Sequence, residues 1–238
     1  MWKRTSRGLT LTFHLAGINN QNFLMRDDQT GTFWQQITGR GISGPLAGTQ
    51  LELVPSSELS FALWKTQTGR KTVLKPVAKY ARDYAEKDWD VHMAKVKTVL
   101  DFPGSGMKPR DLILGVNAFG VSRAYPLPRI QSARLIEDRL NGTAVLIVLG
   151  PDGKSIRAFE RAPDAANREN DYFSLVQRPS VAMNTPLFMD SATGSTWNFD
   201  GCAVAGSARG ICLKPVAATE DYWFDWRNYH PQTTVFRR

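Results

Sequence analysis

Alternation of apolar and polar residues, with a period of two, dominates the hydrophobic pattern of this chain. It predicts strands at Leu9–Leu15 and at Leu51–Val54. The turns between such segments are rich in Gly, Asn and Asp, which adopt the backbone angles of tight turns. Further strands are predicted at 23–25, 32–37, 112–116, 122–125, 144–149 and 156–160, and a polar loop at 163–170. The pattern therefore predicts a mainly β protein.

A helical period of 3.6 appears only in short pieces. One helix is predicted over Glu58–Lys65, with Ser56 or Ser57 as its N-cap, and another is predicted after Thr219. Two acidic residues follow Thr219 and would place negative charge at the positive end of the second helix. Each helix carries two aromatic residues three positions apart, so we expect each helix to close the core of its own half.

Two stretches of the sequence, 27–74 and 189–236, match one another. Three matching pairs are 163 residues apart: Gly31, Thr32 and Trp34 correspond to Gly194, Ser195 and Trp197. Five more pairs are 162 residues apart: Gly44, Gly48, Leu51, Trp64 and Val73 correspond to Gly206, Gly210, Leu213, Trp226 and Val235. We interpret them as two copies of one module and expect a pseudo-two-fold β-barrel or sheet architecture. One compact unit would contain a first repeat (about 9–75), a β-rich connection (about 76–185) and a second repeat motif (about 186–238), with the copies packed against each other.

The repeated motif Asp-x-x-Thr-Gly-Thr/Ser-x-Trp has two interpretations. Asp27 and the hydroxyl groups near it could form a polar site, or they could form a self-bonded turn with a Trp anchor. The turn is favoured, because a single active site is asymmetric whereas a structural device recurs in each copy. The glycine-rich stretch at 41–48 lacks the Lys-Ser/Thr and the helix of a phosphate-binding loop, so we expect bulges or close backbone approaches there.

Function, if it needs asymmetry, is expected in the part of the chain that has no matching copy. An Arg offers a fixed fork to a carboxylate or phosphate, and a Tyr can donate a hydrogen bond to a developing oxyanion. The alternative is an internal Arg–Asp pair with the Tyr as a packing residue. No Ser lies in a GxSxG motif, which disfavours a Ser-His-Asp hydrolase. The candidate catalytic residues are Arg82, Asp83, Tyr84, Arg123 and Tyr125, with Asp27 or His230 alongside.

Histidine and cysteine are scarce. Three dispersed His residues and no CxxC pair predict no metal site, and no cofactor is predicted. Cys202 and Cys212 flank a turn centred on Ser207, so they can face each other on adjacent strands as a disulfide or as two buried thiols. His14 alternates within a predicted strand and can face inward. His230 follows the second helix, where the helix dipole would favour a cationic imidazole.

The net charge of +8 and the pI of about 9.7 allow two interpretations. One is an anionic partner, and the other is a basic but solvated surface. Lys and Arg are scattered and form no arginine-rich arm, which favours the solvated surface and disfavours nucleic acid as a partner. No apolar run reaches the roughly 18 residues of a membrane span. The N-terminal segment alternates as a strand does, so we do not expect it to be a signal peptide.

An ordered set of motifs resembles one bacterial and archaeal family. The motifs are FLMRDDQTGTFWQQITGRGISGPLAGTQLELVP at 23–55, Arg82-Asp83-Tyr84, Ile113–Val116, Arg123–Pro126 and Tyr229–Thr233. They resemble the family called domain of unknown function 3179 over nearly the whole chain. The resemblance implies a protein of the cell envelope or an exported protein, and it implies no established activity. The chain departs from the family at Asp28, where Arg is usual, at Gln67-Thr68-Gly69, where HPxT is usual, and in lacking the upstream Cys-Pro-x-Cys-like strand.

Two classes of function follow. The first is a ligand-binding β module of the cell envelope, which binds a small molecule or a polymer in a cleft between the two repeats. The second is an enzyme of unknown reaction, with one asymmetric Arg/Tyr/Asp site between the repeats. Binding of acidic polymers to the positive surface is a third and weaker hypothesis.

Overall fold

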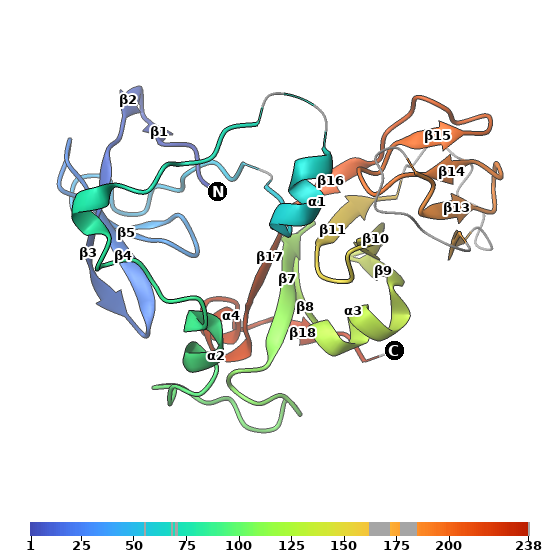
Figure 1. The fold of residues 1–238 in the computed structure, drawn as a ribbon. Helices are drawn as coiled ribbons and strands as arrows, with labels where there is room; N and C mark the ends of the chain where they lie inside the picture. The colour runs from blue at the N-terminus through green and yellow to red at the C-terminus, as the bar shows by residue number, and fades with distance from the viewer. Residues whose placement is uncertain (55, 68, 70, 162–171, 177–184, 238) are drawn as a thin grey trace.

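The computed structural model describes residues 1–54, 56–67, 69, 71–161, 172–176 and 185–237. The protein is mainly β, as the alternating pattern predicts. Its described strands form a two-stranded ribbon and four four-stranded sheets (Figure 1). Closing a barrel requires the two outer strands of a sheet to pair, and the outer strands here pair on one side only. The prediction of a barrel is therefore wrong for this part of the chain. The predicted loop at 163–170 lies outside the described residues.

Two of the sheets contain the first part of each matching stretch of the sequence, and their strands follow the same order. The N-terminal sheet consists of β3 (Phe13–Asn19), β4 (Asn22–Asp27), β5 (Phe33–Gln35) and β6 (Gly41–Ser43), and the ribbon of β1 (Thr5–Ser6) and β2 (Leu9–Thr10) precedes it. The C-terminal sheet consists of β12 (Phe173–Leu175), β13 (Phe188–Asp190), β14 (Thr196–Trp197) and β15 (Ala203–Ala205). Figure 1 shows them at opposite ends of the molecule. They do not pack against each other as expected, because the remaining sheets lie between them.

The two central sheets contain most of the core. One has the order β17 (Ala218–Tyr222), β7 (Leu112–Ala118), β8 (Val121–Pro126) and β18 (Thr234–Val235). The other has the order β16 (Lys214–Val216), β11 (Ile156–Glu160), β10 (Thr143–Leu149) and β9 (Leu135–Leu140). The two sheets share one cluster of buried residues, which includes Val116 and Ile147, and Ile130 of the helix at 127–133 packs into the same cluster. The final strands β16–β18 come from the second matching stretch, so the end of the chain completes both sheets.

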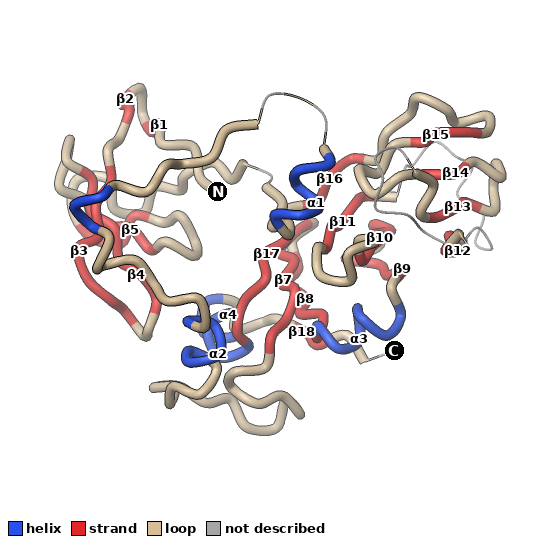
Figure 2. Tube along the Cα trace, in the orientation of Figure 1, coloured by secondary structure: helices blue, strands red, loops and turns tan. Residues whose placement is uncertain are grey.

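The described helices are all short. They are α1 (Phe61–Thr66), the 3-10 helix η1 (Ala78–Tyr80), α2 (Trp89–Met93), α3 (Leu127–Ala133) and α4 (Trp223–Tyr229). Figure 2 shows that the long connection from α1 to β7 is mostly loop. Leu63 of α1 packs in the core beneath the C-terminal sheet, and α4 packs on β7 and β8. The expectation that each helix closes its own half is therefore wrong.

Both predicted helix starts are also wrong. The N-cap of α1 is Ser60, whose Oγ accepts a hydrogen bond from the Leu63 amide and donates one to Asp152 at 2.6 Å. Asp152 belongs to the turn between β10 and β11, so a distant segment selects the cap. Thr219 lies within β17 instead of at the start of α4, because pairing with β7 keeps residues 218–222 extended.

The repeated Asp-x-x-Thr motif forms the same hydrogen bonds in both sheets. Asp27 accepts from the Thr30 amide at 2.6 Å and from the Trp34 indole at 2.8 Å. Asp190 accepts the equivalent bonds from Thr193 at 2.6 Å and from Trp197 at 2.8 Å. These bonds lower the pKa of the buried Asp27 carboxyl despite the opposing effect of its burial. The observed bonds are those of a self-bonded turn with a Trp anchor.

The two cysteines form a disulfide between neighbouring strands. Cys202 and Cys212 occupy opposed positions in an antiparallel bridge, and their Sγ atoms are 2.00 Å apart. In the N-terminal sheet, Arg40 and Gln50 are opposed in the same way. Of the two alternatives that the sequence leaves open, a disulfide and two buried thiols, the structure therefore has the disulfide.

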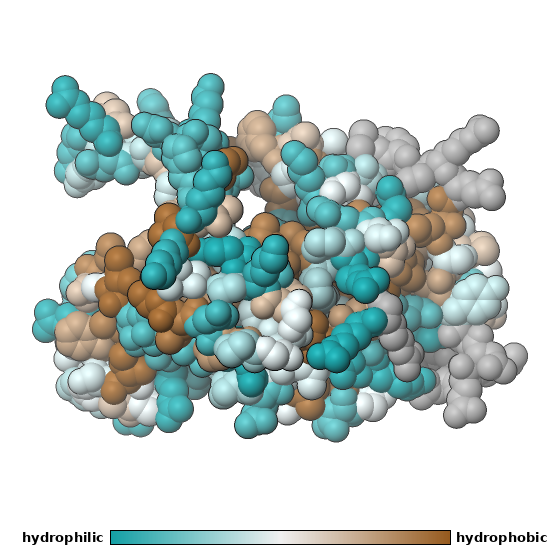
Figure 3. Space-filling view, turned by 90° about the horizontal axis from the view of Figure 1, so that it is seen from below, coloured by the Kyte–Doolittle hydropathy of each residue, from teal (hydrophilic) through white to brown (hydrophobic). Residues whose placement is uncertain are grey.

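The N-terminal sheet carries an exposed apolar surface. The side chains of Leu15, Ile18 and Phe23 are 63%, 69% and 55% exposed. Seen from below, apolar residues gather on the side of the molecule where this sheet lies (Figure 3). His14 is exposed on the same strand and contacts Asp28 at 2.9 Å, so the interpretation that it faces inward is wrong. The described chain leaves this face uncovered.

Candidate functional site

Three of the predicted site residues lie in the loop that follows η1. Arg82, Asp83 and Tyr84 are exposed, and the Tyr84 hydroxyl accepts a hydrogen bond from the Val77 amide at 2.8 Å. Figure 1 shows η1 beside the N-terminal sheet, away from β8. The structure therefore does not bring these three residues together with Arg123 or Tyr125.

Arg123 and Tyr125 form an internal tie. Both lie on β8, and both donate to Asp138 of β9, Arg123 through Nη1 at 2.5 Å and Tyr125 through its hydroxyl at 2.9 Å. Burial raises the pKa of the fully buried Tyr125, and the charge of Asp138 raises it further. This is the arrangement that the alternative interpretation describes, an Arg–Asp pair with Tyr as a packing residue. It joins the two central sheets.

His230 lies at the C-terminal end of α4, as predicted, but in a different charge state. Its ring lies against the Trp226 ring, with the ring centroids 3.9 Å apart and the planes tilted by 34°. Burial lowers the pKa of His230 to about 4, so the imidazole is neutral at pH 7. Burial thus opposes the cationic form that the helix dipole would favour. Ser122 Oγ is 3.5 Å from His230 Nδ1, too far for a strong hydrogen bond.

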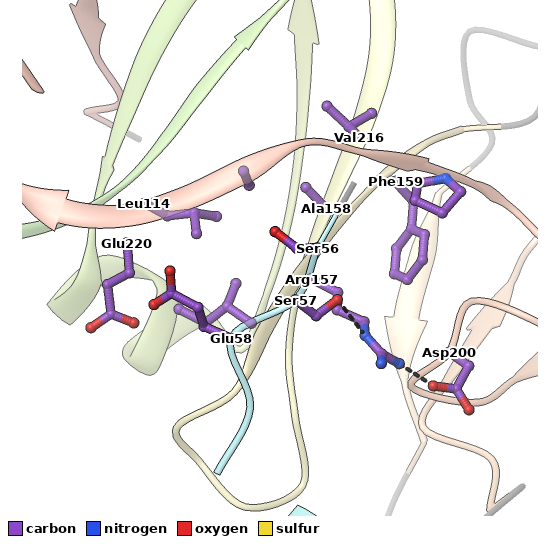
Figure 4. Close-up of a pocket in the computed structure, with 13 residues that line it drawn as sticks. Ser56, Ser57, Glu58, Leu114, Arg157, Ala158, Phe159, Asp200, Val216 and Glu220 are labelled. Atoms are coloured by element: carbon purple, nitrogen blue, oxygen red, sulfur yellow. Dashed lines mark hydrogen bonds and ion pairs between the residues drawn. The ribbon is translucent and has the colours of Figure 1, made fainter. Parts of the chain in front are cut away.

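The candidate site is instead a cavity of about 290 Å³ in the middle of the molecule. It lies among the segment before α1, the strands β7 and β11, and the segment from β16 to β17 (Figure 4). Leu114, Ile156 and Val216 contribute apolar walls from three strands. Glu58 and Glu220 enter the cavity from two of the chain segments and lie next to each other in Figure 4. The cavity thus combines an apolar wall with a pair of carboxyl groups.

The two glutamates affect each other's ionisation. Burial raises the pKa of Glu220, and the nearby charge of Glu58 raises it further. Glu58 keeps a surface open to the solvent of the cavity, but protein atoms on its other sides desolvate it and raise its pKa, and the positive charge of the N-terminal ammonium only partly offsets this increase. Neither carboxyl group forms an ion pair or a hydrogen bond with another described side chain. A proton or a cationic ligand would therefore relieve their repulsion.

Two more carboxyl groups lie behind this pair. Burial raises the pKa of Asp221 to about 8, and the charges of Asp225 and Glu58 contribute to the increase. Asp225 is only 7% exposed and accepts a hydrogen bond from Asn22 Nδ2 at 2.8 Å. This bond ties the tip of the β3–β4 hairpin to α4. In the part of the chain that the structure describes, no three His, Cys, Asp or Glu side chains are placed to hold a metal ion.

The end of the cavity away from the glutamates is polar, and its charged side chains already pair with each other. Arg157 donates to Asp200 and to the Ser57 hydroxyl, and its guanidinium lies 4.7 Å from the centre of the Phe199 ring. These contacts hold Arg157 at the wall and neutralise its charge. Its remaining N–H groups can still donate to a ligand. The cavity therefore has an acidic end and a neutral polar end.

The sequence analysis missed the glutamate pair, although the sequence contains a signal for it. Glu58 and Glu220 are 162 residues apart, the spacing that matches Leu51 with Leu213. The first helical residues, Phe61 and Trp223, have the same spacing. The pair occupies matching positions in the two stretches, so a comparison of the acidic positions between 51 and 64 with those between 213 and 226 would have identified it.

The comparisons with known proteins give one result. The family model described as "Protein of unknown function (DUF3179)" matches residues 1–233. No significant match to a curated protein or to a solved structure was found. No helix among the described residues is long and apolar enough to cross a membrane.

Proposed function

Because the chain belongs to a protein family of unknown function (DUF3179), we propose its function from the central cavity: it binds a small molecule whose cationic group lies against Glu58 and Glu220. The observation that carries this proposal is the pair of neighbouring carboxyl groups, which form no ion pair with a described side chain. The N-terminal ammonium, which donates to Ser56 Oγ at 3.3 Å, acts on Glu58 only from beyond ion-pair distance. The protein as a whole has a net charge of +8, so an acidic cavity is a local exception. An ammonium or amidinium group would replace the missing partner.

The size and lining of the cavity define the rest of the ligand. Its volume of about 290 Å³ is at the lower end of the range for small-molecule pockets, roughly 300–1,000 Å³. The walls near the glutamates are apolar, and Arg157 and Ser57 lie at the other end. A compact ligand with a cationic head, a short apolar body and a hydrogen-bond acceptor fits this arrangement.

We also propose that the two matching stretches are copies of one module and that the cavity lies between their ends. The equivalent Asp–Trp turns support this, as do the matching positions of Glu58 and Glu220. The ring of Phe13 meets Trp34 edge-on at 6.0 Å, and Phe173 meets Trp197 in the same way at 6.2 Å. In this account 9–75 and 186–238 are the repeats, and 76–185 provides the central strands.

We place this activity in an oxidising compartment such as the cell envelope. The disulfide between Cys202 and Cys212 supports this, because disulfides are rare in a reducing cytosol. The location agrees with the expectation from the family resemblance.

A second candidate function is general acid–base catalysis by the same glutamates. Glu220 is half-buried beside Asp221, whereas Glu58 faces the open cavity, so their surroundings differ. Two carboxyl groups in different surroundings can serve as acid and base. The catalytic roles of Arg82, Asp83, Tyr84, Arg123 and Tyr125 stay predictions.

Titration with n-butylamine tests the binding proposal, with 1-butanol as a neutral ligand of similar length. Binding to the full chain is measured by calorimetry at pH 8. The wild type should bind the amine better than the alcohol, and the double variant Glu58→Gln/Glu220→Gln should lose about tenfold or more in affinity, the effect of one charge-assisted hydrogen bond. Glu86→Gln removes an exposed carboxylate of the same type and should bind as the wild type does.

Affinity for the amine should also rise with pH. The pKa of each glutamate is raised in the free protein, so protons compete with the amine until the pH exceeds both values. Equal affinities of the amine for the double variant and the wild type would refute the proposed site.

A further inference from the structure

A second cavity lies at the end of α4, and it has the opposite electrostatic character. Its volume is about 600 Å³. It is lined by the loop 101–105, by Trp223 and Arg227 of α4, and by the segment 233–237 without residue 236. The two cavities share no lining residue. A ligand in the second cavity would therefore contact neither glutamate.

Two arginines line this cavity without a partner. Within the part of the chain that the structure describes, the side chains of Arg227 and Arg237 form no ion pair and no hydrogen bond. The Arg227 guanidinium lies 5.9 Å from the centre of the Phe102 ring, which orients it but occupies none of its N–H groups. Arg123, Arg157 and Arg161, which are also half-buried, each have a carboxylate partner. The unpaired guanidinium groups are available to an anion.

Two threonine hydroxyls add to the hydrogen-bonding capacity of the wall. Thr233 Oγ1 accepts a bond from the Trp226 indole at 2.9 Å, and Thr234 Oγ1 accepts one from Arg123 Nε at 3.1 Å. Each hydroxyl uses an oxygen lone pair in this way and keeps its own O–H for another acceptor. Both residues line the cavity.

One acidic residue, Asp101, opposes the arginines, so the charged groups of the lining sum to a single positive charge. It forms no ion pair with either arginine, and it would repel an anion placed beside it. The ligand's anionic group therefore belongs at the arginine side. Phe102, Pro103 and Trp223 provide apolar surface for the remainder of the ligand.

We propose that this cavity binds the oxyanion group of a small molecule, a carboxylate or a phosphate, between Arg227 and Arg237. Guanidinium groups bind both oxyanions through paired N–H donors. Inorganic phosphate and acetate are the probes that distinguish the two sources of this chemistry.

NMR titration of the full chain tests the proposal. Phosphate or acetate is added at constant ionic strength, with chloride as the compensating anion, because screening alone changes weak electrostatic binding. Saturable shifts are expected at the Gly104 amide and at the Trp223 indole. Arg227→Gln should weaken binding by about tenfold or more, since it removes a charge-assisted hydrogen bond.

The control is Arg209→Gln, which removes the same charge from an exposed position in the C-terminal sheet region. It should leave the affinity within about twofold of the wild type. Arg237→Gln provides a second test at an exposed site where the fold is not at risk. Saturable binding of either probe that both cavity variants weaken supports the site. Equal weakening by Arg209→Gln, or shifts spread over the whole surface, would overturn it.

Discussion

Asp221→Asn should remove a pH dependence from the stability of this protein. The Asp221 carboxyl is buried beside Asp225, and its pKa is raised to about 8 from the ordinary 3.8. A group whose pKa is raised by folding stabilises the folded state below its unfolded pKa, and that contribution is lost as the pH rises through the folded value. The wild type should therefore lose stability between about pH 4 and pH 8. Asn fits the same space and does not ionise.

The magnitude follows from the size of the shift. Each pKa unit corresponds to about 1.4 kcal/mol, so a shift from 3.8 to about 8 sets an upper limit of about 6 kcal/mol. The carboxyl groups of Asp221 and Asp225 interact, so their protons are shared between the two sites and the effect of one is smaller. We expect the free energy of unfolding of Asp221→Asn to rise by about 2–3 kcal/mol relative to that of the wild type as the pH increases from 4 to 8.

Urea denaturation at intervals from pH 4 to pH 9 measures this difference. Asp83→Asn is the control, because it removes an exposed carboxylate and should give a curve parallel to that of the wild type. If the free energies of unfolding of Asp221→Asn and the wild type stay parallel over the whole range, the carboxyl is not desolvated and the reasoning fails.

Three further predictions concern stability. Cys202→Ser should lower the free energy of unfolding by about 3 kcal/mol, because it opens a loop with a sequence separation of 10, and a reducing agent should destabilise the wild type as much while leaving the variant unchanged. Trp34→Phe and Trp197→Phe should each lower the free energy of unfolding by about 1.5–3 kcal/mol, since each removes one hydrogen-bond donor from a buried carboxylate. A loss confined to one of the two variants would argue against equivalent modules. Gly115→Ala should lower the free energy of unfolding in urea by about 1–3 kcal/mol, because an added Cβ would lie 2.3 Å from the buried Trp226 ring. In the control Gly17→Ala, the added Cβ meets no atom within 4 Å, so stability should change little. Equal losses in the two variants would contradict the packing.

Features that depend on neighbouring residues could be predicted from the sequence. The turn at Asp27 forms because Thr30 and the residues around it supply their own hydrogen bonds. The strands at 112–116, 122–125, 144–149 and 156–160 were found for the same reason, since their apolar pattern is local.

Features that depend on distant segments could not be predicted. Ser60 became the cap of α1 because Asp152, 92 residues away, binds its hydroxyl. Residues 218–222 became a strand because β7 offers them an unpaired edge. The cores that α1 and α4 cover are also invisible to a periodic pattern, which shows that a helix has an apolar face but not where that face packs.

The candidate site illustrates the same limit. The Arg and Tyr residues of the middle segment are the kinds of residue that catalysis uses, yet Arg123 and Tyr125 bind Asp138. The glutamate pair has no local motif at all. It forms only where the two matching stretches bring Glu58 and Glu220 to one cavity.

The central claim is that these two glutamates form a partly desolvated pair that accepts a cation. Carboxyl-detected NMR measures their titration directly, with and without n-butylamine. We predict that at least one of the two titrates above the ordinary glutamate pKa of 4.5 in the free protein, and that the amine lowers its midpoint. Ordinary midpoints for both glutamates, unchanged by the amine, would contradict the account.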